Sequence, residues 1–246
     1  MRYFFLILLS VLSLPLIPYT HVWAHGGIPR VLSITPPKNA QDHLWVIDTL
    51  GVFKGTTTEE FRTRNWAWLC DDAIDPTLGV DDLLIINEQV MVAIAKSGLY
   101  RSEDGGCQFL RINSDVSDQA LGIISAHPTR TNELVVYTDS ISQENSVWWS
   151  TDSGLTWMRS TLAVEGTIYE LWRSTQNPDH IWVNHALGLS LSIDGGQHFQ
   201  TIETQGYGLN VSPHEVRLIG GGRLGDKTAL FIALNRYPTA SLLLSV

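Results

Sequence analysis

The sequence predicts an all-β fold that repeats one four-stranded unit. Three observations predict it. An octapeptide occurs three times, short β-rich runs precede each copy at matching places, and nine tryptophans occur in a chain without helical periodicity. Repeats of about 40–50 residues with four strands each are typical of propeller blades. Such blades bury their faces against each other, which accounts for the high tryptophan content.

The octapeptide has the pattern Ser-x-Asp-x-Gly-x-x-aromatic. Its Asp carboxylate can accept backbone N–H groups across a turn, and its Gly supplies a φ angle that other residues resist. The aromatic side chain is expected beneath the turn, which joins the third strand to the fourth. The pattern residues are Ser102, Asp104, Gly106 and Phe109, then Ser150, Asp152, Gly154 and Trp157, then Ser192, Asp194, Gly196 and Phe199.

The strands before each octapeptide are predicted from alternating apolar residues bounded by Gly, Pro, Asn and Asp. They cover residues 83–86, 90–94 and 98–101, then 122–126, 134–137 and 146–149, then 168–172, 181–183 and 188–191. The first-to-second strand turns share one face of the disc with the octapeptides. The second-to-third turns and the links between blades share the other face.

Two further copies extend the repeat outward. Runs at 31–34, 44–47 and 51–54 form an earlier copy, whose octapeptide at 56–61 lacks the Asp and the Gly. Runs at 216–219, 230–233 and 241–245 begin a fifth copy, and the sequence stops where its octapeptide would start. We therefore expect about five blades, with the last one incomplete and the domain truncated, because closed propellers have four to eight complete blades.

The octapeptide resembles the Asp-box, or BNR repeat. That repeat occurs in sialidases, sortilin-type receptors, some glucan hydrolases and photosystem assembly factors of the Ycf48 type. The resemblance spans the mature chain and implies a β-propeller. It also implies that the boxes are structural turns and not substrate contacts.

Residues 1–24 are predicted to be a secretory signal peptide, followed by one propeller domain at 25–246. Arg2 precedes an apolar stretch at 4–17, and Val22 and Ala24 suit a cleavage site. The stretch is shorter than the roughly 20 residues that a membrane span needs. We expect a secreted or periplasmic protein that does not span the membrane after cleavage.

The two cysteines, Cys70 and Cys107, are expected to form a disulfide after export, because the compartment is oxidising and their number is even. The argument against pairing is the separation of an outer strand from a turn, on the order of 13 Å at about 3.3 Å per residue. Neither cysteine has a histidine at zinc-site spacing. We predict no metal and no cofactor.

Charge excludes one class of partner. The chain has 25 acidic and 16 basic residues and no basic run, whereas nucleic-acid binding needs clustered cations. The segment at 71–82 contains a cluster of aspartates and is interpreted as a solvated loop. The alternative is an acidic active-site rim or a cation site. We expect no nucleic-acid partner.

Function is predicted to lie on the disc face opposite the octapeptides, where loops are polar and unequal in length. The candidate ligand residues there are Asp139, His185, Arg236 and Tyr237. No catalytic residue is predicted, since the chain lacks the sialidase Arg-Ile-Pro motif and a recognisable carboxylate pair. The leading interpretation is a binding or scaffold module for a protein or glycan. The alternatives are a sialidase-like or glucanase-like glycoside hydrolase and an assembly factor of the Ycf48 type.

Overall fold

The computed structural model describes residues 31–35, 43–48, 51–57, 63–69, 74, 80–202, 216–224, 227–234 and 241–245. The expected signal peptide lies outside these residues, as do Cys70, Arg236 and Tyr237. In the described part of the chain no helix is long and apolar enough to cross a membrane.

Among the described residues, nineteen strands form five antiparallel sheets in chain order. The first sheet holds β1 (Val31–Thr35), β2 (His43–Asp48), β3 (Gly51–Thr57) and β4 (Thr63–Leu69). The second holds β5 (Val80–Ile85), β6 (Met91–Ala95), β7 (Gly98–Ser102) and β8 (Leu110–Arg111). The third holds β9 (Leu121–Ala126), β10 (Leu134–Thr138), β11 (Val147–Ser150) and β12 (Met158–Arg159).

The fourth sheet holds β13 (Ile168–Arg173), β14 (Ile181–His185), β15 (Gly188–Ser192) and β16 (Gln200–Ile202). The fifth has three described strands, β17 (Val216–Leu224), β18 (Lys227–Leu234) and β19 (Ser241–Ser245). The sequence prediction of four-stranded repeats with an incomplete last copy is confirmed. A short 3-10 turn at Asp115–Asp118, which the sequence reading did not include, links β8 to β9.

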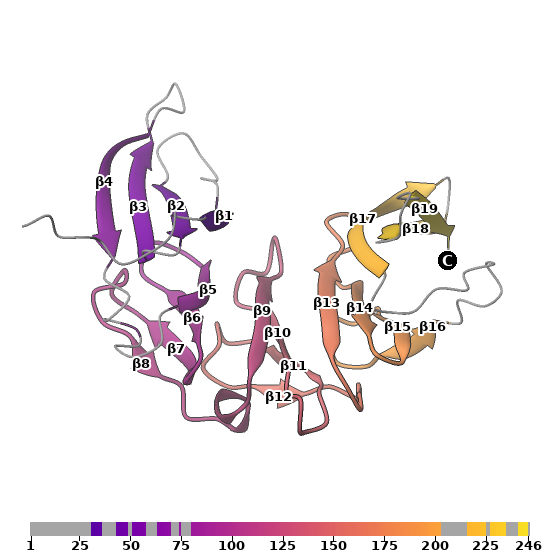
Figure 1. The fold of residues 1–246 in the computed structure, drawn as a ribbon. Coiled ribbons are helices and arrows are strands. Elements are labelled where there is room, and N and C mark those ends of the chain that lie inside the picture. Colours follow the sequence, from indigo (N-terminus) through magenta and orange to yellow (C-terminus); the bar gives the residue numbers. More distant parts are fainter. Residues whose placement is uncertain are drawn as a thin grey trace, which may run out of the picture.

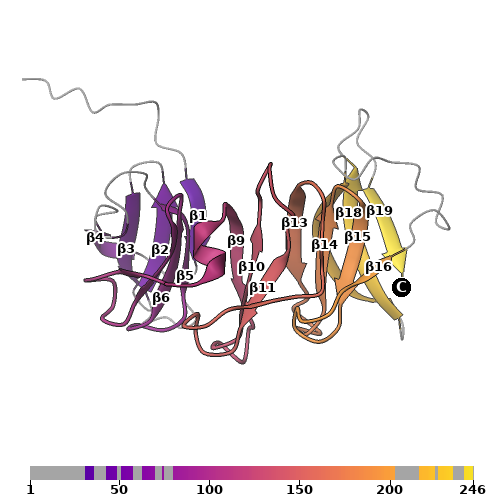
Figure 2. The same cartoon turned by 90° about the horizontal axis from the view of Figure 1, so that it is seen from below.

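The sheets are arranged along an open arc (Figure 1). The first strand of each sheet lies toward the inside of the arc and the last strand toward the outside. Seen from below, the five sheets stand side by side (Figure 2). This arrangement brings the broad face of each sheet against the next one.

The core consists of the layers between neighbouring sheets. The middle strands β6, β10 and β14 are buried at every residue. Because strand side chains alternate between faces, Met91 packs toward the first sheet while Val92 packs toward the third. A similar layer joins the third and fourth sheets through Val135 and Ile181. These apolar layers explain why the second strand of each repeat has no polar alternation.

Candidate functional site

The three octapeptides form the same hydrogen-bonded turn. In each one the Ser Oγ donates to the Asp carboxylate at 2.8 Å and accepts the Gly backbone N–H at 2.9–3.0 Å. The same carboxylate accepts the backbone N–H four residues further on. The glycines have positive φ angles, which a side chain would strain: Gly106 at 92°, Gly154 at 83° and Gly196 at 102°.

These bonds affect the acidity of the octapeptide aspartates. The backbone N–H of Gln108 is the main cause that lowers the pKa of Asp104. Burial raises the pKa of Asp152 and Asp194, but hydrogen bonds from the turn outweigh it and leave both pKa values lowered. The carboxylates are therefore committed to holding the turn.

Each octapeptide turn is bonded to the first-to-second strand loop of its own sheet. Gly105, Ser153 and Gly195 donate their backbone N–H groups to the carbonyls of Gln89, Asn132 and Asp179, at 2.9 Å in every case. The two kinds of loop thus share one end of the sheet. This end is called the octapeptide face below.

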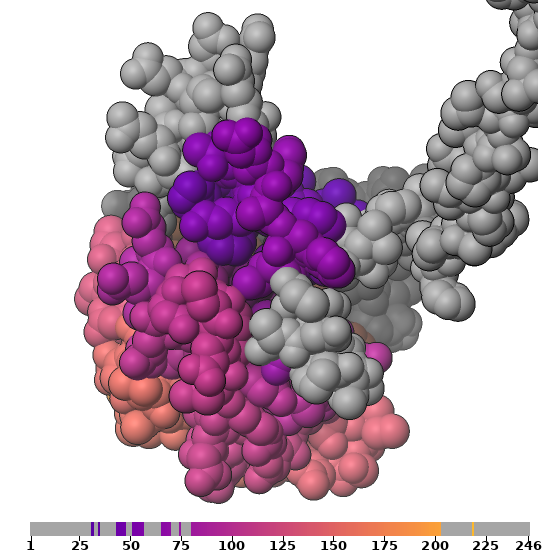
Figure 3. All heavy atoms as spheres, turned by 90° about the vertical axis from the view of Figure 1, so that its left-hand side faces the viewer, coloured from indigo at the N-terminus to yellow at the C-terminus, as the bar shows by residue number. Residues whose placement is uncertain are grey.

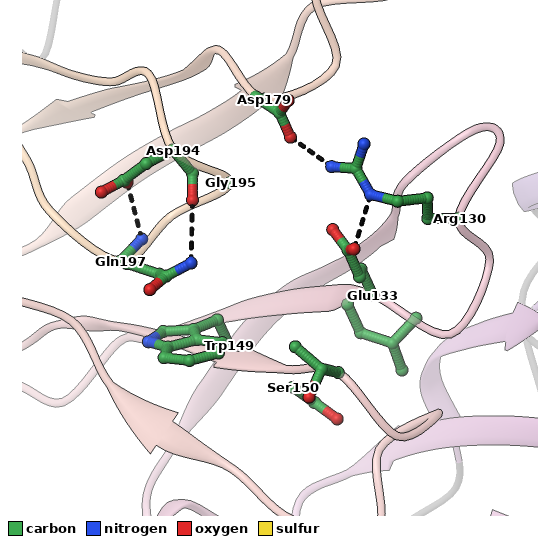
Figure 4. A pocket seen from close by; sticks show the side chains of 10 residues that line it. Arg130, Glu133, Trp149, Ser150, Asp179, Asp194, Gly195 and Gln197 are labelled. Carbon is green, nitrogen blue, oxygen red and sulfur yellow. Dashed lines mark hydrogen bonds and ion pairs between the residues drawn. The ribbon is translucent and has the colours of Figure 1, made fainter.

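A hollow of roughly 230 Å³ opens on the octapeptide face between the third and fourth sheets. Trp149 from β11 lies across its floor, with Gln197 and Asp194 on one side and Arg130 and Glu133 on the other (Figure 4). Trp149 is half-buried, and Gln197 is exposed. An aromatic surface surrounded by carboxylates, an amide and a guanidinium suits a small polyhydroxylated ligand.

Arg130 closes one side of the hollow and joins the two sheets. Its guanidinium donates to Glu133 of its own loop and to Asp179 of the neighbouring sheet. These two bonds are the main causes that raise the pKa of Arg130. With Glu133, Asp179 and Asp194 against the single cation Arg130, the charged lining is net negative. The hollow therefore disfavours an anionic ligand.

His127 lies buried behind this ion pair, and burial is the main cause that lowers its pKa. Its Nδ1 accepts the backbone N–H groups of Thr129 and Arg130 at 3.2 and 3.0 Å. Nδ1 therefore carries no hydrogen, and the neutral ring carries it on Nε2. Nε2 lies 3.7 Å from Asp179 Oδ1.

That tautomer decides whether the site suits a metal. His127, Glu133 and Asp179 have ligand atoms within 4.8 Å of one another. A neutral histidine binds a metal through an unprotonated nitrogen, but here Nε2 bears the hydrogen and Nδ1 is occupied by backbone donors. Arg130 also pairs with both carboxylates. The arrangement fits an ion-pair network better than a metal centre.

A larger hollow of roughly 430 Å³ lies at the first octapeptide. Its lining includes Arg101, Asp104, Leu110 and Arg111 but no aromatic side chain. It lacks the flat apolar surface that Trp149 gives the smaller hollow. The smaller hollow is therefore the better candidate site.

Two of the four ligand residues expected from the sequence, Asp139 and His185, lie among the described residues. Asp139 is exposed, and loss of water around its carboxyl raises its pKa. His185 is buried, with Nε2 at 2.9 Å from Ser190 Oγ, and burial lowers its pKa. The placement of His185 in a loop was wrong, because His185 is the last residue of β14 and lies inside the sheet. Arg236 and Tyr237 lie outside the described residues.

The acidic segment at 71–82 also differs in part from its interpretation as a solvated loop. Asp82 belongs to β5, where it pairs with Ile94 of β6. Its Oδ2 accepts the backbone N–H of Ile124 in the next sheet at 3.1 Å. Glu170 of β13 does the same for Leu218 of β17 at 2.5 Å. Burial raises the pKa of Asp82. These carboxylates link the inner strands of neighbouring sheets.

Cys107 is exposed and forms no disulfide within the part of the chain that the structure describes. A side chain placed on Gly106 would lie 3.4 Å from Leu69, so the segments that bear the two cysteines are neighbours. The closeness of Gly106 and Leu69 removes the main argument against pairing, which assumed a separation of about 13 Å. The disulfide to Cys70 stays a prediction, which peptide mapping under non-reducing conditions tests.

The sequence reading missed the residues of the hollow. The sequence pattern places Arg130 and Asp179 of the hollow only in turns between the first and second strands. The sequence does indicate that these turns lie near the octapeptides, because the turns and the octapeptides are predicted on the same face of the disc. What was missing was the packing of two neighbouring sheets, which brings Arg130 to Asp179 across 49 positions of sequence.

Comparison with known proteins gives structural neighbours only. No protein-family profile matches the sequence. No curated protein matches it either. An ancestral GH74 enzyme superposes on 88% of this chain with a TM-score of 0.62 and 13% identity, over 31% of the enzyme. The GH74 enzyme of Niastella koreensis superposes on 86% with a TM-score of 0.56 and 18% identity, over 34% of its length.

A third similar structure is the extracellular domain of a one-component system from B. thetaiotaomicron. It covers 83% of this chain with a TM-score of 0.50 and 13% identity, over 26% of its own length. The chain thus spans about a third of the length of each GH74 enzyme and about a quarter of the length of the third protein. At such identities the similarity shows the fold alone. Together with the repeated sheets, it identifies the chain as an all-β propeller with four four-stranded sheets and a fifth of three described strands.

Proposed function

We propose that this chain is an exported binding or scaffold module that holds an uncharged glycan in the hollow between its third and fourth sheets. The observation that carries the proposal is the half-buried Trp149 surrounded by Arg130, Glu133, Asp179 and Gln197. A sugar ring stacks its C–H face on an aromatic ring and gives its hydroxyl groups to carboxylates and amides. The Asp-box assignment of the octapeptides belongs to the same proposal and supports a rigid scaffold.

The charge of the hollow favours one glycan class. Three carboxylates and one guanidinium line it, so a sialylated or uronic-acid ligand meets repulsion. The sialidase-like alternative requires clustered arginines for the substrate carboxylate, and Arg130 is already paired with two carboxylates. A neutral oligosaccharide meets no such obstacle.

Binding to an oligosaccharide panel tests the proposal. Mature protein from residue 25 is titrated with neutral and sialylated oligosaccharides. We expect neutral ones to bind, and Gln197→Ala to weaken binding at least several-fold without changing the melting temperature. Leu187→Ala is the matched control, because Leu187 is 65% exposed and does not line the hollow.

Three results would change the assignment. Weakened binding in Asp139→Ala or Arg236→Ala, with Gln197→Ala unaffected, would return the ligand to the opposite face of the disc. Turnover of a β-glucan or a sialoside, abolished by Glu133→Gln, would favour the glycoside hydrolase alternative. Binding to a protein and to no glycan would favour a scaffold of the assembly-factor kind.

Export is tested separately. Mass spectrometry of secreted or periplasmic protein should find His25 at the N-terminus. An intact Met1 in the exported material contradicts the proposed cleavage.

A further inference from the structure

The first sheet has one face that no described sheet covers. In an antiparallel ladder, directly paired residues point to the same face. The pairs Ile34 with Val46, Val46 with Phe53, and Phe53 with Trp68 therefore define one face of this sheet. Trp66 belongs to the same face, since it is two residues from Trp68 on β4. These five apolar residues are called the open face.

The open face faces away from the second sheet. Trp45, Ile47 and Val52, on the other face of the same strands, pack in the layer shared with Met91. On the open face Ile34 is 57%, Trp66 50% and Trp68 60% exposed. Figure 3, viewed from the side of the first sheet, shows atoms of its strands at the molecular surface.

Equivalent positions in the other sheets show what the open face lacks. Val46 of β2 corresponds to Ala93 of β6, Val136 of β10 and Val183 of β14 in the repeat. Those three residues are fully buried, because each packs against the preceding sheet. Val46 is only half-buried. The open face is thus the same kind of surface as three interfaces within the molecule, without the sheet that covers the others.

The opposite end of the arc supplies the matching geometry. The fifth sheet contacts the fourth through β17 on β13 and β14. In every earlier sheet the face turned away from its predecessor receives the next sheet, and no described sheet follows β17–β19 (Figure 1). The described sheets therefore end in two faces of opposite sense.

We propose that the open face docks the fifth sheet of a second copy of this chain, so that copies associate head to tail. The contact continues the sheet-to-sheet packing already present four times among the described sheets. Such a contact is heterologous, and it grows into rings or open chains according to the rotation between copies. Exposed tryptophans on a flat sheet supply its apolar centre.

Sedimentation velocity over a concentration series tests the association. Mature wild-type protein should gain mass with concentration up to about 100 μM, above the micromolar Kd of a weak interface. The double variant Trp66→Ser, Trp68→Lys should remain monomeric at the same concentrations, with an unchanged β-sheet circular dichroism spectrum. Ile141→Ser is the control and should associate like the wild type, because Ile141 is fully exposed on the β10–β11 loop. A monomeric wild type, or association unaffected by the double variant, overturns the proposal.

A mixing experiment separates head-to-tail from face-to-face association. The double variant keeps its fifth sheet, so a fluorescently labelled sample should bind wild-type chains at their open faces and limit growth. In a symmetric contact between two open faces, the variant could not bind the wild type at all. Failure of the labelled variant to sediment with associating wild-type protein therefore overturns the head-to-tail arrangement. If the double variant unfolds, Ile34→Lys replaces it, since Ile34 is exposed on β1.

Discussion

The outer hairpin of the first sheet differs from those of the next three sheets. β3 and β4 have seven residues each, whereas β8 and β12 have two and β16 has three. In the three sheets with an octapeptide, the third strand ends at the serine of the pattern. The serine Oγ accepts a hydrogen bond from the backbone N–H of the turn glycine, and the chain leaves the ladder there.

The difference indicates what the octapeptide contributes. It replaces a long, regular outer hairpin with a fixed turn that is bonded to the neighbouring loop of its sheet. The first sheet lacks the pattern, and its outer strand continues with Trp66 and Trp68 exposed. The octapeptide is therefore a device that ends strands and places loops, and the hollow is built from loops that it places.

The largest expected effect on stability comes from replacing Trp157, and Trp66 in the first sheet provides the comparison. Trp157→Ala should lower the free energy of unfolding by about 3–5 kcal/mol, because its ring is 8% exposed and its Nε1–H donates to the Gly154 carbonyl at 3.0 Å. Trp66→Ala in the first sheet should cost under about 1 kcal/mol, since its ring is half exposed. Urea unfolding at a concentration where the chain is monomeric measures both. Equal losses would contradict the contrast.

A smaller effect is expected for the turn carboxylate. Asp152→Ala should cost about 1–3 kcal/mol, because the backbone N–H of Thr156 and the Oγ–H of Ser150 lose their acceptor. Asp152→Asn keeps one oxygen and should cost less. Thermal unfolding gives the loss, and glycan binding by the folded protein should not change. Lost binding with an unchanged melting temperature would make Asp152 itself a ligand residue.

Acid should destabilise the sheets through their buried histidines. Burial holds the pKa of His127 and His185 below the ordinary value of 6.5, so the unfolded chain binds more protons than the folded one between the two values. Their contribution is complete above about pH 6.5 and is lost as the pH falls toward the folded pKa. The slope is at most about 1.4 kcal/mol per pH unit for each proton.

His127→Gln sharpens this test. It removes one of the two titrating rings, so the fall in melting temperature from pH 7 to pH 5 should become shallower. A wild-type melting temperature that rises on acidification over this interval would show that the buried histidines do not control the response.

The smallest effect is expected at the link between the third and fourth sheets on the octapeptide face. Arg130→Met removes ion pairs to Glu133 and Asp179 that are close to half exposed, so it should cost under about 1 kcal/mol. Chemical unfolding measures the cost. A loss comparable to that of Trp157→Ala would mean that loop ion pairs, and not apolar layers, hold neighbouring sheets together.

Much of the fold could be predicted from the sequence because the strands and turns of each repeat are specified by residues close together in the chain. The β-branched and aromatic run at 134–137 and the Ser that ends each third strand depend on near neighbours in the chain. The candidate site could not be predicted in the same way. Trp149 is an ordinary strand residue in the sequence, and Arg130 and Asp179 are ordinary turn residues, until two sheets pack and bring them to one hollow.

By itself the sequence determined the number and order of the strands, the turns that end them and the incomplete last repeat, since short-range hydrogen bonding and side-chain alternation specify these features. Only the tertiary structure decided that His185 is buried and that Asp82 bonds to the next sheet. It also decided that the open face of the first sheet lies uncovered. These features depend on which faces of separate sheets meet, and that contact is set by packing between residues tens of positions apart.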